Sequence, residues 1–198
     1  MERAVLKQFM MVFSVIPLLG LPVSTIVRSP AVHESRSLRH ELTVDVDLSA
    51  RRLVVKIDGR QAGSYEVAVG KPEHRTPTGT YKLSQVVWNP SWVPPDEAWA
   101  DTAEKKEPGE KGNPMGRVKI LFDEQLYIHG TSDHKTLGDP VSHGCIRMRN
   151  ADAMKLARLV MEYGGASKPK GWYSTVQKKP KEPFEVAIPD PPVLRITQ

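Results

Sequence analysis

A thiol, two imidazoles and a guanidinium lie close together in the second half of the sequence. Cys145 follows His143 by two residues and precedes Arg147 by two. A further imidazole, His129, ends an apolar run upstream. A thiol becomes a good nucleophile when a base or a positive neighbour favours the thiolate. Either imidazole could supply that base, so the pattern predicts cysteine-dependent nucleophilic chemistry.

The residues around the cysteine suit such a reaction. Gly144 permits a tight backbone turn at the nucleophile, so that the amide N–H groups of Gly144 and Cys145 can face a developing oxyanion. Arg147 can hold a substrate carboxylate through paired hydrogen bonds. A buried, inert cysteine is the plainer interpretation. The polar neighbours Ser142 and His143 argue against it.

Zinc is the alternative chemistry for these side chains. Five residues nearby carry the nitrogen, sulfur or oxygen atoms that zinc binds, namely His129, Asp133, His134, His143 and Cys145. However, a His-x-Cys spacing places two ligands awkwardly on one short turn, and the sequence has no HExxH helix. We therefore favour a metal-free thiol. With a single cysteine in the chain, no intramolecular disulfide can form.

Short alternating stretches predict the strands that must position these residues. Residues 42–48 place apolar side chains at every second position, which is typical of a half-buried strand. Further strands are predicted at residues 53–57, 65–69, 80–83, 85–88, 117–122, 126–129 and 184–188. Asp58-Gly59 and Asp123-Glu124 predict turns. The 17 prolines in 198 residues disfavour a bundle of long helices.

One helix is clearly predicted, after the cysteine. Its apolar residues recur at the spacing of an amphipathic helix, namely Ala153, Leu156, Ala157, Val160 and Met161. Asn150 is the predicted N-cap, and Gly164-Gly165 is the predicted end. The fold class that follows is a mainly β domain with one clear α-helix.

A long polar connection interrupts the strands. Residues 94–116 carry many charges, and Trp88, Trp92 and Trp99 lie in or beside this region. Connections of this length are usually functional or mobile. A lid over a binding groove and a plain surface insertion are both open interpretations.

The N-terminal region differs from the rest of the chain. Arg3 and Lys7 precede an uncharged stretch that runs from Gln8 to Val27, and residues 1–27 are therefore predicted to be a signal peptide or signal anchor. We expect export, with membrane contact only through this segment. The other predicted parts are a linker (28–40), a catalytic domain (41–165) and a Lys/Pro-rich C-terminal extension (166–198). A net charge of +5 without a basic run gives no support to nucleic-acid binding.

The sequence resembles the L,D-transpeptidase family, the YkuD-type catalytic domain. In this resemblance His129-Gly130-Thr131 is followed, after ten residues, by Ser142-His143-Gly144-Cys145-Ile146-Arg147-Met148. Further matching segments are 46–49, 52–53, 67–71, 76–81, 89–90, 113–116 and 150–153. The likeness covers about residues 42–165. It implies a β-sandwich-like domain built around the cysteine, in an exported enzyme of the periplasm or cell wall.

The resemblance also implies a role for each motif residue. Cys145 would be the nucleophile and His129 its general base, with the Gly130 carbonyl orienting the imidazole. His143 would shape the site and is the second candidate for the base. The residues expected to contact the substrate or the oxyanion are Gly130, Ser142, Gly144 and Arg147. No metal or organic cofactor is implied.

The implied reaction is a two-step acyl transfer on peptidoglycan stem tetrapeptides, through a thioester. An amine from a neighbouring stem would form a 3–3 cross-link, and a protein lysine would attach a protein to the wall. Water as the acceptor would make the enzyme an L,D-carboxypeptidase. A non-catalytic peptidoglycan-binding module of the same fold is the alternative from another class, against which the complete set of motif residues argues.

Overall fold

The computed structural model describes residues 40–198. The predicted signal or anchor (1–27) and the predicted linker, except for its last residue, lie outside the described residues. Within these residues, the secondary structure consists of twelve strands, two α-helices and two short 3₁₀ helices. This confirms the predicted mainly β fold class. Among the described helices, none has both the length and the apolar character needed to cross a membrane.

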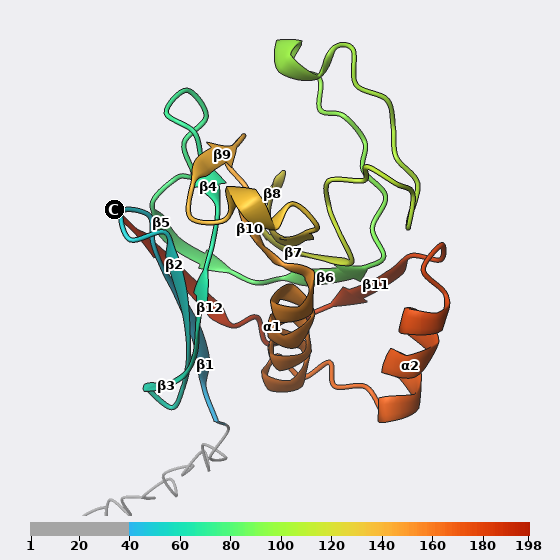
Figure 1. Ribbon diagram of the computed structural model, residues 1–198. Helices are drawn as coiled ribbons and strands as arrows, with labels where there is room; N and C mark the ends of the chain where they lie inside the picture. The colour runs from blue at the N-terminus through green and yellow to red at the C-terminus, as the bar shows by residue number, and fades with distance from the viewer. Residues whose placement is uncertain (1–39) are drawn as a thin grey trace, which may run out of the picture. The chain divides into compact units, whose positions relative to one another are not determined.

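The first of two five-stranded sheets has the order β3-β2-β1-β12-β5 (Figure 1). Only the β1–β12 pair is parallel, and the other pairs are antiparallel. The bounds are β1 Leu42–Asp47, β2 Arg52–Ile57, β3 Arg60–Glu66, β5 Gly79–Lys82 and β12 Val193–Thr197. Asp58 and Gly59 join β2 to β3 with φ of 52° and 75°. This is the backbone of the tight hairpin that the Asp-Gly pair predicted.

The second sheet has the order β10-β8-β7-β6-β11, and only β10–β8 is parallel. Its bounds are β6 Gln85–Trp88, β7 Val118–Asp123, β8 Leu126–Thr131, β10 Ile146–Arg149 and β11 Phe184–Ala187. The remaining elements are the strand pair β4 Val69–Gly70 with β9 Pro140–Ser142, the 3₁₀ helices Ala98–Ala100 and His134–Thr136, and the helices α1 Asn150–Tyr163 and α2 Lys170–Lys178.

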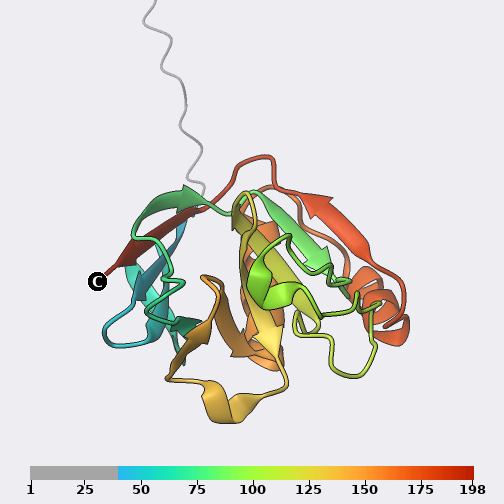
Figure 2. The same cartoon turned by 90° about the horizontal axis from the view of Figure 1, so that it is seen from above.

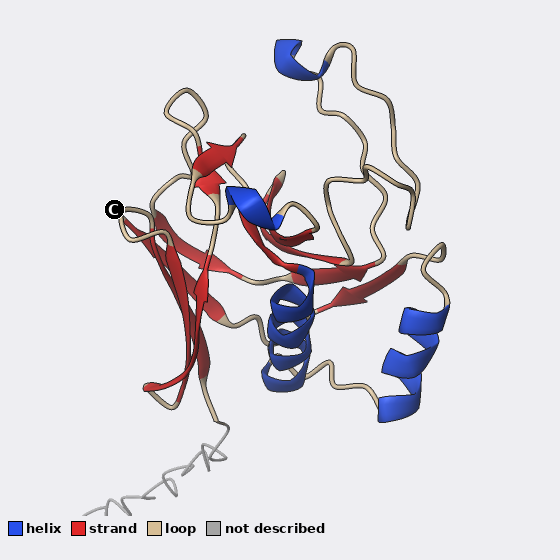
Figure 3. Ribbon diagram, in the orientation of Figure 1, coloured by secondary structure: helices blue, strands red, loops and turns tan. Residues whose placement is uncertain are grey.

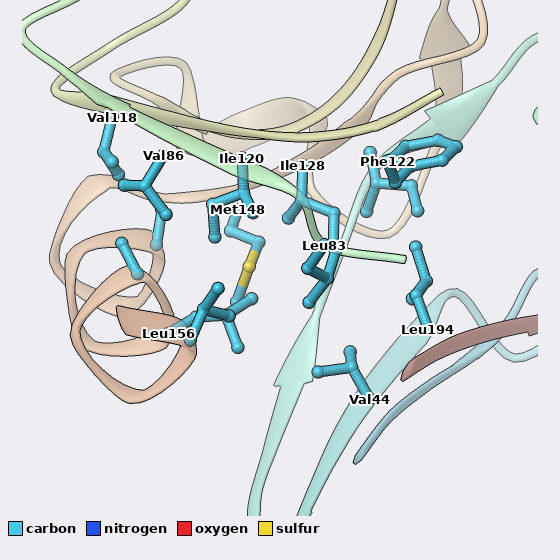
Figure 4. Packing of buried hydrophobic residues seen from close by; sticks show 14 of the residues in the cluster. Val44, Leu83, Val86, Val118, Ile120, Phe122, Ile128, Met148, Leu156 and Leu194 are labelled. Atoms are coloured by element: carbon cyan, nitrogen blue, oxygen red, sulfur yellow. The ribbon is translucent and has the colours of Figure 1, made fainter. Parts of the chain in front are cut away.

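The two faces of the second sheet carry different kinds of side chain. On one face, a row of buried aliphatic residues runs across all five strands in register: Ile146, Ile128, Ile120, Val86 and Val186. Figure 4 shows three of them, Val86, Ile120 and Ile128, in the same buried cluster as Leu156 of α1. In Figure 3, α1 and the long loop between β6 and β7 lie on opposite sides of this sheet. Because strand side chains alternate between faces, the residues next to this aliphatic row lie on the face toward the loop.

Two local predictions were wrong. The predicted strand 65–69 is split, because the chain changes partners there. The Val67 N–H donates to the Arg51 carbonyl, and Ala68 exchanges two backbone hydrogen bonds with Arg147. Asn150 is not the N-cap of α1 and is its first helical residue instead. Its Oδ1 accepts a hydrogen bond from the Arg117 N–H at 2.8 Å, so a distant partner takes the predicted capping oxygen. The predicted helix end at Gly164-Gly165 is confirmed, with φ of 77° at Gly165.

Residues after 165 belong to both sheets, since β11 pairs with β6 and β12 lies between β1 and β5. The predicted boundary at residue 165 therefore does not mark an edge of the fold. The helix α2 was not predicted from the sequence. Its Trp172 and Tyr173 meet Trp88 edge-on, with ring centroids 6.1 and 5.7 Å apart. Such aromatic packing stabilises a helix whose own sequence signal is weak.

Candidate active site

The second sheet brings the predicted reactive residues to one face. Arg147 of β10 lies opposite His129 of β8, and His129 lies opposite Lys119 of β7. This row is the neighbour of the buried aliphatic row, and it therefore lies on the opposite face. Cys145 directly precedes β10 and lines the same cleft as these three residues.

A cleft of about 760 Å³ lies over this face. Its floor contains the four residues of the preceding paragraph together with Tyr127. Its wall comes from the connection between β6 and β7, residues 89–117, which we call the lid loop. Ser91–Glu97, Trp99 and Met115 of this loop line the cleft. Figure 2 shows the loop lying across the strands. The connection thus forms part of the cleft, which is consistent with the interpretation as a lid.

Cys145 follows a tight turn. The Ser142 hydroxyl donates to the Cys145 carbonyl at 2.5 Å, which closes the turn. Gly144 has a φ of 102°, a conformation that other residues rarely adopt. The thiol is half-buried, and burial raises its pKa above the ordinary value. A hydrogen bond from the Tyr127 backbone and the charges of Arg147 and Lys119 oppose that rise.

His129 is almost fully buried, with 1% of its surface exposed. Its Nδ1 lies 3.0 Å from the Gly130 carbonyl. Because a carbonyl oxygen only accepts, Nδ1 carries the proton and donates. Burial lowers the pKa of His129 to about 4, against the opposing effect of that hydrogen bond. The imidazole is therefore neutral at pH 7, and its Nε2 is left with a lone pair.

Asn150 supports the backbone next to His129, a role that the sequence analysis missed. A Cβ at Gly130 would lie 2.2 Å from Asn150 Oδ1, and one at Gly116 would lie 2.3 Å from the same atom. The two glycines are thus required for the close approach of this carboxamide. In the sequence, the available signal for this contact was the position of the two glycines, Gly130 near the end of β8 and Gly116 just before β7.

His143 lies between two rings. Trp99 of the lid loop stacks on it with centroids 3.7 Å apart and planes at 10°, and His74 meets it edge-on at 4.8 Å. Glu97 accepts a hydrogen bond from Trp99 Nε1 at 2.7 Å and lies 3.9 Å from His74 Nδ1. Burial lowers the pKa of His143, with help from the Lys71 charge. These contacts suit His143 to shaping the cleft. Its contacts with Trp99 and His74 were not predicted from the sequence.

Two cations line the cleft floor. The Nε of Arg147 is buried and has no hydrogen-bond partner among residues 40–198. Lys119, which the sequence analysis did not single out, places Nζ 4.4 Å from the centre of the Tyr127 ring. Burial lowers the pKa of both side chains. The signal for Lys119 was a lysine within the otherwise apolar stretch Val118–Phe122.

The alternative zinc ligands do not assemble. In the described part of the chain, no three histidine, cysteine, aspartate or glutamate residues lie close enough to hold a metal ion. The candidate ligands Asp133 and His134 are thus not grouped with His129, His143 and Cys145 into such a set.

Comparisons with known proteins agree with one another. The family model of the YkuD L,D-transpeptidase catalytic domain matches residues 41–190. The putative L,D-transpeptidase YkuD of Bacillus subtilis strain 168 is 28% identical over 142 residues, which are 71% of this chain and 73% of that protein. The putative L,D-transpeptidase YqjB of the same strain is 32% identical over 123 residues, which are 59% of this chain and 65% of that protein.

Solved structures share the fold. An L,D-transpeptidase from Mycobacterium smegmatis has a TM-score of 0.51 at 18% identity, covering 80% of this chain and 59% of that one. The L,D-transpeptidase 3 of Mycobacterium tuberculosis, solved with a faropenem-derived adduct, gives 0.51 at 18%, covering 80% and 61%. This chain thus spans about three fifths of each of these structures. Because the family model matches most of the chain, this protein belongs to the YkuD family of L,D-transpeptidase catalytic domains.

Proposed function

We propose that this protein is a cysteine-dependent L,D-transpeptidase acting on peptidoglycan stem tetrapeptides. One observation carries the proposal. Cys145 and His129 line one cleft, and the hydrogen bond from His129 Nδ1 to Gly130 leaves Nε2 available as a base. A nucleophile, a base and an orienting acceptor are the parts that acyl transfer by a thiol requires.

In the first step, Cys145 Sγ attacks the carbonyl carbon of the third stem residue. His129 Nε2 takes the thiol proton and then delivers it to the departing amine of the terminal D-Ala. The amide N–H groups of Gly144 and Cys145 stabilise the oxyanion. A thioester and free D-Ala result. Because the thiol pKa is raised and the imidazole pKa is lowered, the resting pair is neutral, and proton transfer accompanies the attack.

In the second step, an amine attacks the thioester and the Sγ–C bond breaks. His129 accepts the proton of the amine and returns a proton to the sulfur. A stem amine gives a 3–3 cross-link, and a protein lysine gives a wall-attached protein. Water in the same position gives L,D-carboxypeptidase activity, which is the alternative within the same mechanism.

Arg147 is the residue for the terminal carboxylate of the stem. Its guanidinium lines the cleft two residues from the nucleophile, and among residues 40–198 its buried Nε has no hydrogen-bond partner. The Ser142 hydroxyl closes the Cys145 turn, and the Gly130 carbonyl fixes the His129 tautomer. His143 positions the lid loop through Trp99.

The cellular setting belongs to the same proposal. Residues 1–27 direct export as a signal peptide or anchor, residues 28–40 link that segment to the catalytic domain, and the domain works on the periplasmic or cell-wall side of the inner membrane. Its partners are stem peptides and, where a protein is the acceptor, that protein. Neither a metal nor an organic cofactor takes part in the steps above.

The test is mass spectrometry of the purified full chain incubated with disaccharide-tetrapeptides. Cross-linked dimer with loss of D-Ala, absent in Cys145→Ala, is the expected result. Tripeptide alone would favour the carboxypeptidase. Stem binding without any product would favour the non-catalytic module. As a second readout, faropenem should add to the intact mass at Cys145 and leave Cys145→Ala unchanged, as the adduct on the Mycobacterium tuberculosis relative suggests.

A further inference from the structure

We propose that Lys119 binds a second carboxylate of the donor stem, carried by the side chain of its third residue. The cleft would then recognise two carboxylates, the terminal one at Arg147 and the side-chain one at Lys119. This inference rests on the proposed function and names a substrate preference within it.

The placement of the two cations supports the inference. Lys119 and Arg147 are both paired with His129 and lie on its two sides, because β8 is the strand between β7 and β10. Neighbouring strands are about 4.8 Å apart, so the Cα atoms of the two cations are roughly 10 Å apart. Both side chains line the cleft that holds Cys145. The proposed base, His129, is therefore flanked by a positive charge on each side.

Among residues 40–198, neither cation forms an ion pair, although the charges of Glu185 and Asp133 act on Lys119 and Arg147 respectively. Lys119 Nζ lies over the Tyr127 ring, and the carboxylate that most affects it, Glu185, is two strands away in the same row. The Glu185 carboxylate accepts instead from Gln85 at 3.4 Å. A partly buried charge without a partner is costly for the fold. A lysine here is thus better explained by an anion that the ligand brings.

The chemistry of the stem fits this spacing. The terminal carboxylate lies three bonds beyond the scissile carbonyl carbon, on the leaving side. A diaminopimelate in third position carries its side-chain carboxylate on the acyl side. One carboxylate therefore lies on each side of the bond that Cys145 attacks, as one cation lies on each side of His129. A stem with lysine in third position lacks the second carboxylate and brings a positive side chain instead.

The test uses binding, so that it does not depend on turnover. Full-chain Cys145→Ala is titrated calorimetrically with three disaccharide-tetrapeptides. They carry diaminopimelate, diaminopimelate with its side-chain carboxylate amidated, or lysine in third position. We expect the first stem to bind about tenfold more tightly than the other two, as one charge-assisted hydrogen bond allows. Adding Lys119→Gln should abolish that difference, whereas Lys82→Gln, on exposed β5, should preserve it.

Equal affinity for the three stems, or a preference that survives Lys119→Gln, would overturn the inference. Lys119→Met, which keeps an unbranched apolar stem without the charge, replaces Lys119→Gln if the latter fails to unfold cooperatively. A Lys119-dependent preference in Cys145→Ala, with no turnover by the unmodified chain, would refute the proposed function and leave this inference standing. Turnover by the unmodified chain, with no preference among the three stems, would support the proposed function and refute this inference.

Discussion

The indole of Trp99 lies flat on the imidazole of His143, with ring centroids 3.7 Å apart and planes at 10°. The two residues come from different parts of the site. Trp99 belongs to the lid loop, and His143 belongs to the turn that carries Cys145. This aromatic contact therefore joins the lid loop to the turn that carries Cys145, and the Glu97 carboxylate accepts a hydrogen bond from Trp99 Nε1.

Trp99→Ala should raise KM for the tetrapeptide donor by about two- to tenfold, because a stacked aromatic pair contributes about 0.5–1.5 kcal/mol beyond its buried area. The lid loop should also be cut faster in limited proteolysis. Trp99→Phe keeps a smaller stacked ring and loses the hydrogen bond to Glu97, so its KM should lie between those of Trp99→Ala and the unmodified protein. An unchanged KM and an unchanged rate of cutting in Trp99→Ala would show that the stack does not hold the lid.

The choice of His129 as the base predicts the acid limit of the reaction. Because burial holds the pKa of His129 at about 4, kcat/KM should remain constant down to about pH 5 and fall only near pH 4. An ordinary histidine would give a fall near 6.5. His129→Asn should lose 100-fold or more in the rate of faropenem acylation. His143→Asn should lose far less, and the opposite ranking would make His143 the base.

The same buried imidazole makes stability depend on pH. Between pH 6.5 and about 4, the unfolded state binds a proton at this residue and the folded state does not. Stability therefore falls as the pH falls through this window, by up to about 3 kcal/mol from this group. Above pH 6.5, the group does not make the free energy of unfolding depend on pH. Urea unfolding at pH 7 and pH 4.5 measures the loss, which should be much smaller in His129→Gln. Equal losses would contradict the assignment.

The sequence patterns that predicted the fold are local ones. Alternation at residues 42–48 and the Asp58-Gly59 turn depend on near neighbours, and both are confirmed. The split of the predicted strand 65–69 depends on Arg51 and Arg147, which are not its neighbours in sequence. The helix α2 depends on Trp88 in the same way. Local propensity carries no information about such partners.

In the candidate site, too, local features were visible in the sequence and tertiary contacts were not. The motif around Cys145 is contiguous, and so it was visible in the sequence. Lys119 was visible as a polar residue in an apolar strand, but its place beside His129 follows from the β7–β8 register. Trp99 reaches His143 only because the lid loop folds back over the sheet. Registers and loop paths are set by tertiary packing, which periodicity does not encode.

Asn150→Ala should destabilise the protein by about 1–3 kcal/mol, because it removes the acceptor of the partly buried Arg117 N–H. Activity should fall further than stability alone explains, since the carboxamide also packs against Gly130, whose carbonyl fixes the His129 tautomer. Asn150→Asp, which keeps an acceptor oxygen, should recover most of the stability. Urea unfolding and the rate of faropenem acylation, measured together, separate the two effects.

Gly144→Ala should impair catalysis more than folding. A Cβ at this position would lie 3.0 Å from Leu126 Cδ2, a flexible side-chain end that can move. The φ of 102° is the larger obstacle, since such strain costs on the order of 1–3 kcal/mol for other residues. The turn can relieve this strain by rotating, and rotation displaces the amide N–H groups proposed for the oxyanion.

The matched control is Gly59→Ala, in the turn between β2 and β3. Its φ is also positive, at 75°, and a Cβ there meets nothing within 4 Å. Both variants should lose a similar amount of stability in urea unfolding. Only Gly144→Ala should lose kcat, by tenfold or more, because a single oxyanion donor is worth 100-fold or more when it is lost completely. If the two variants turned over tetrapeptide equally well, the amides of the Cys145 turn would not be the oxyanion donors.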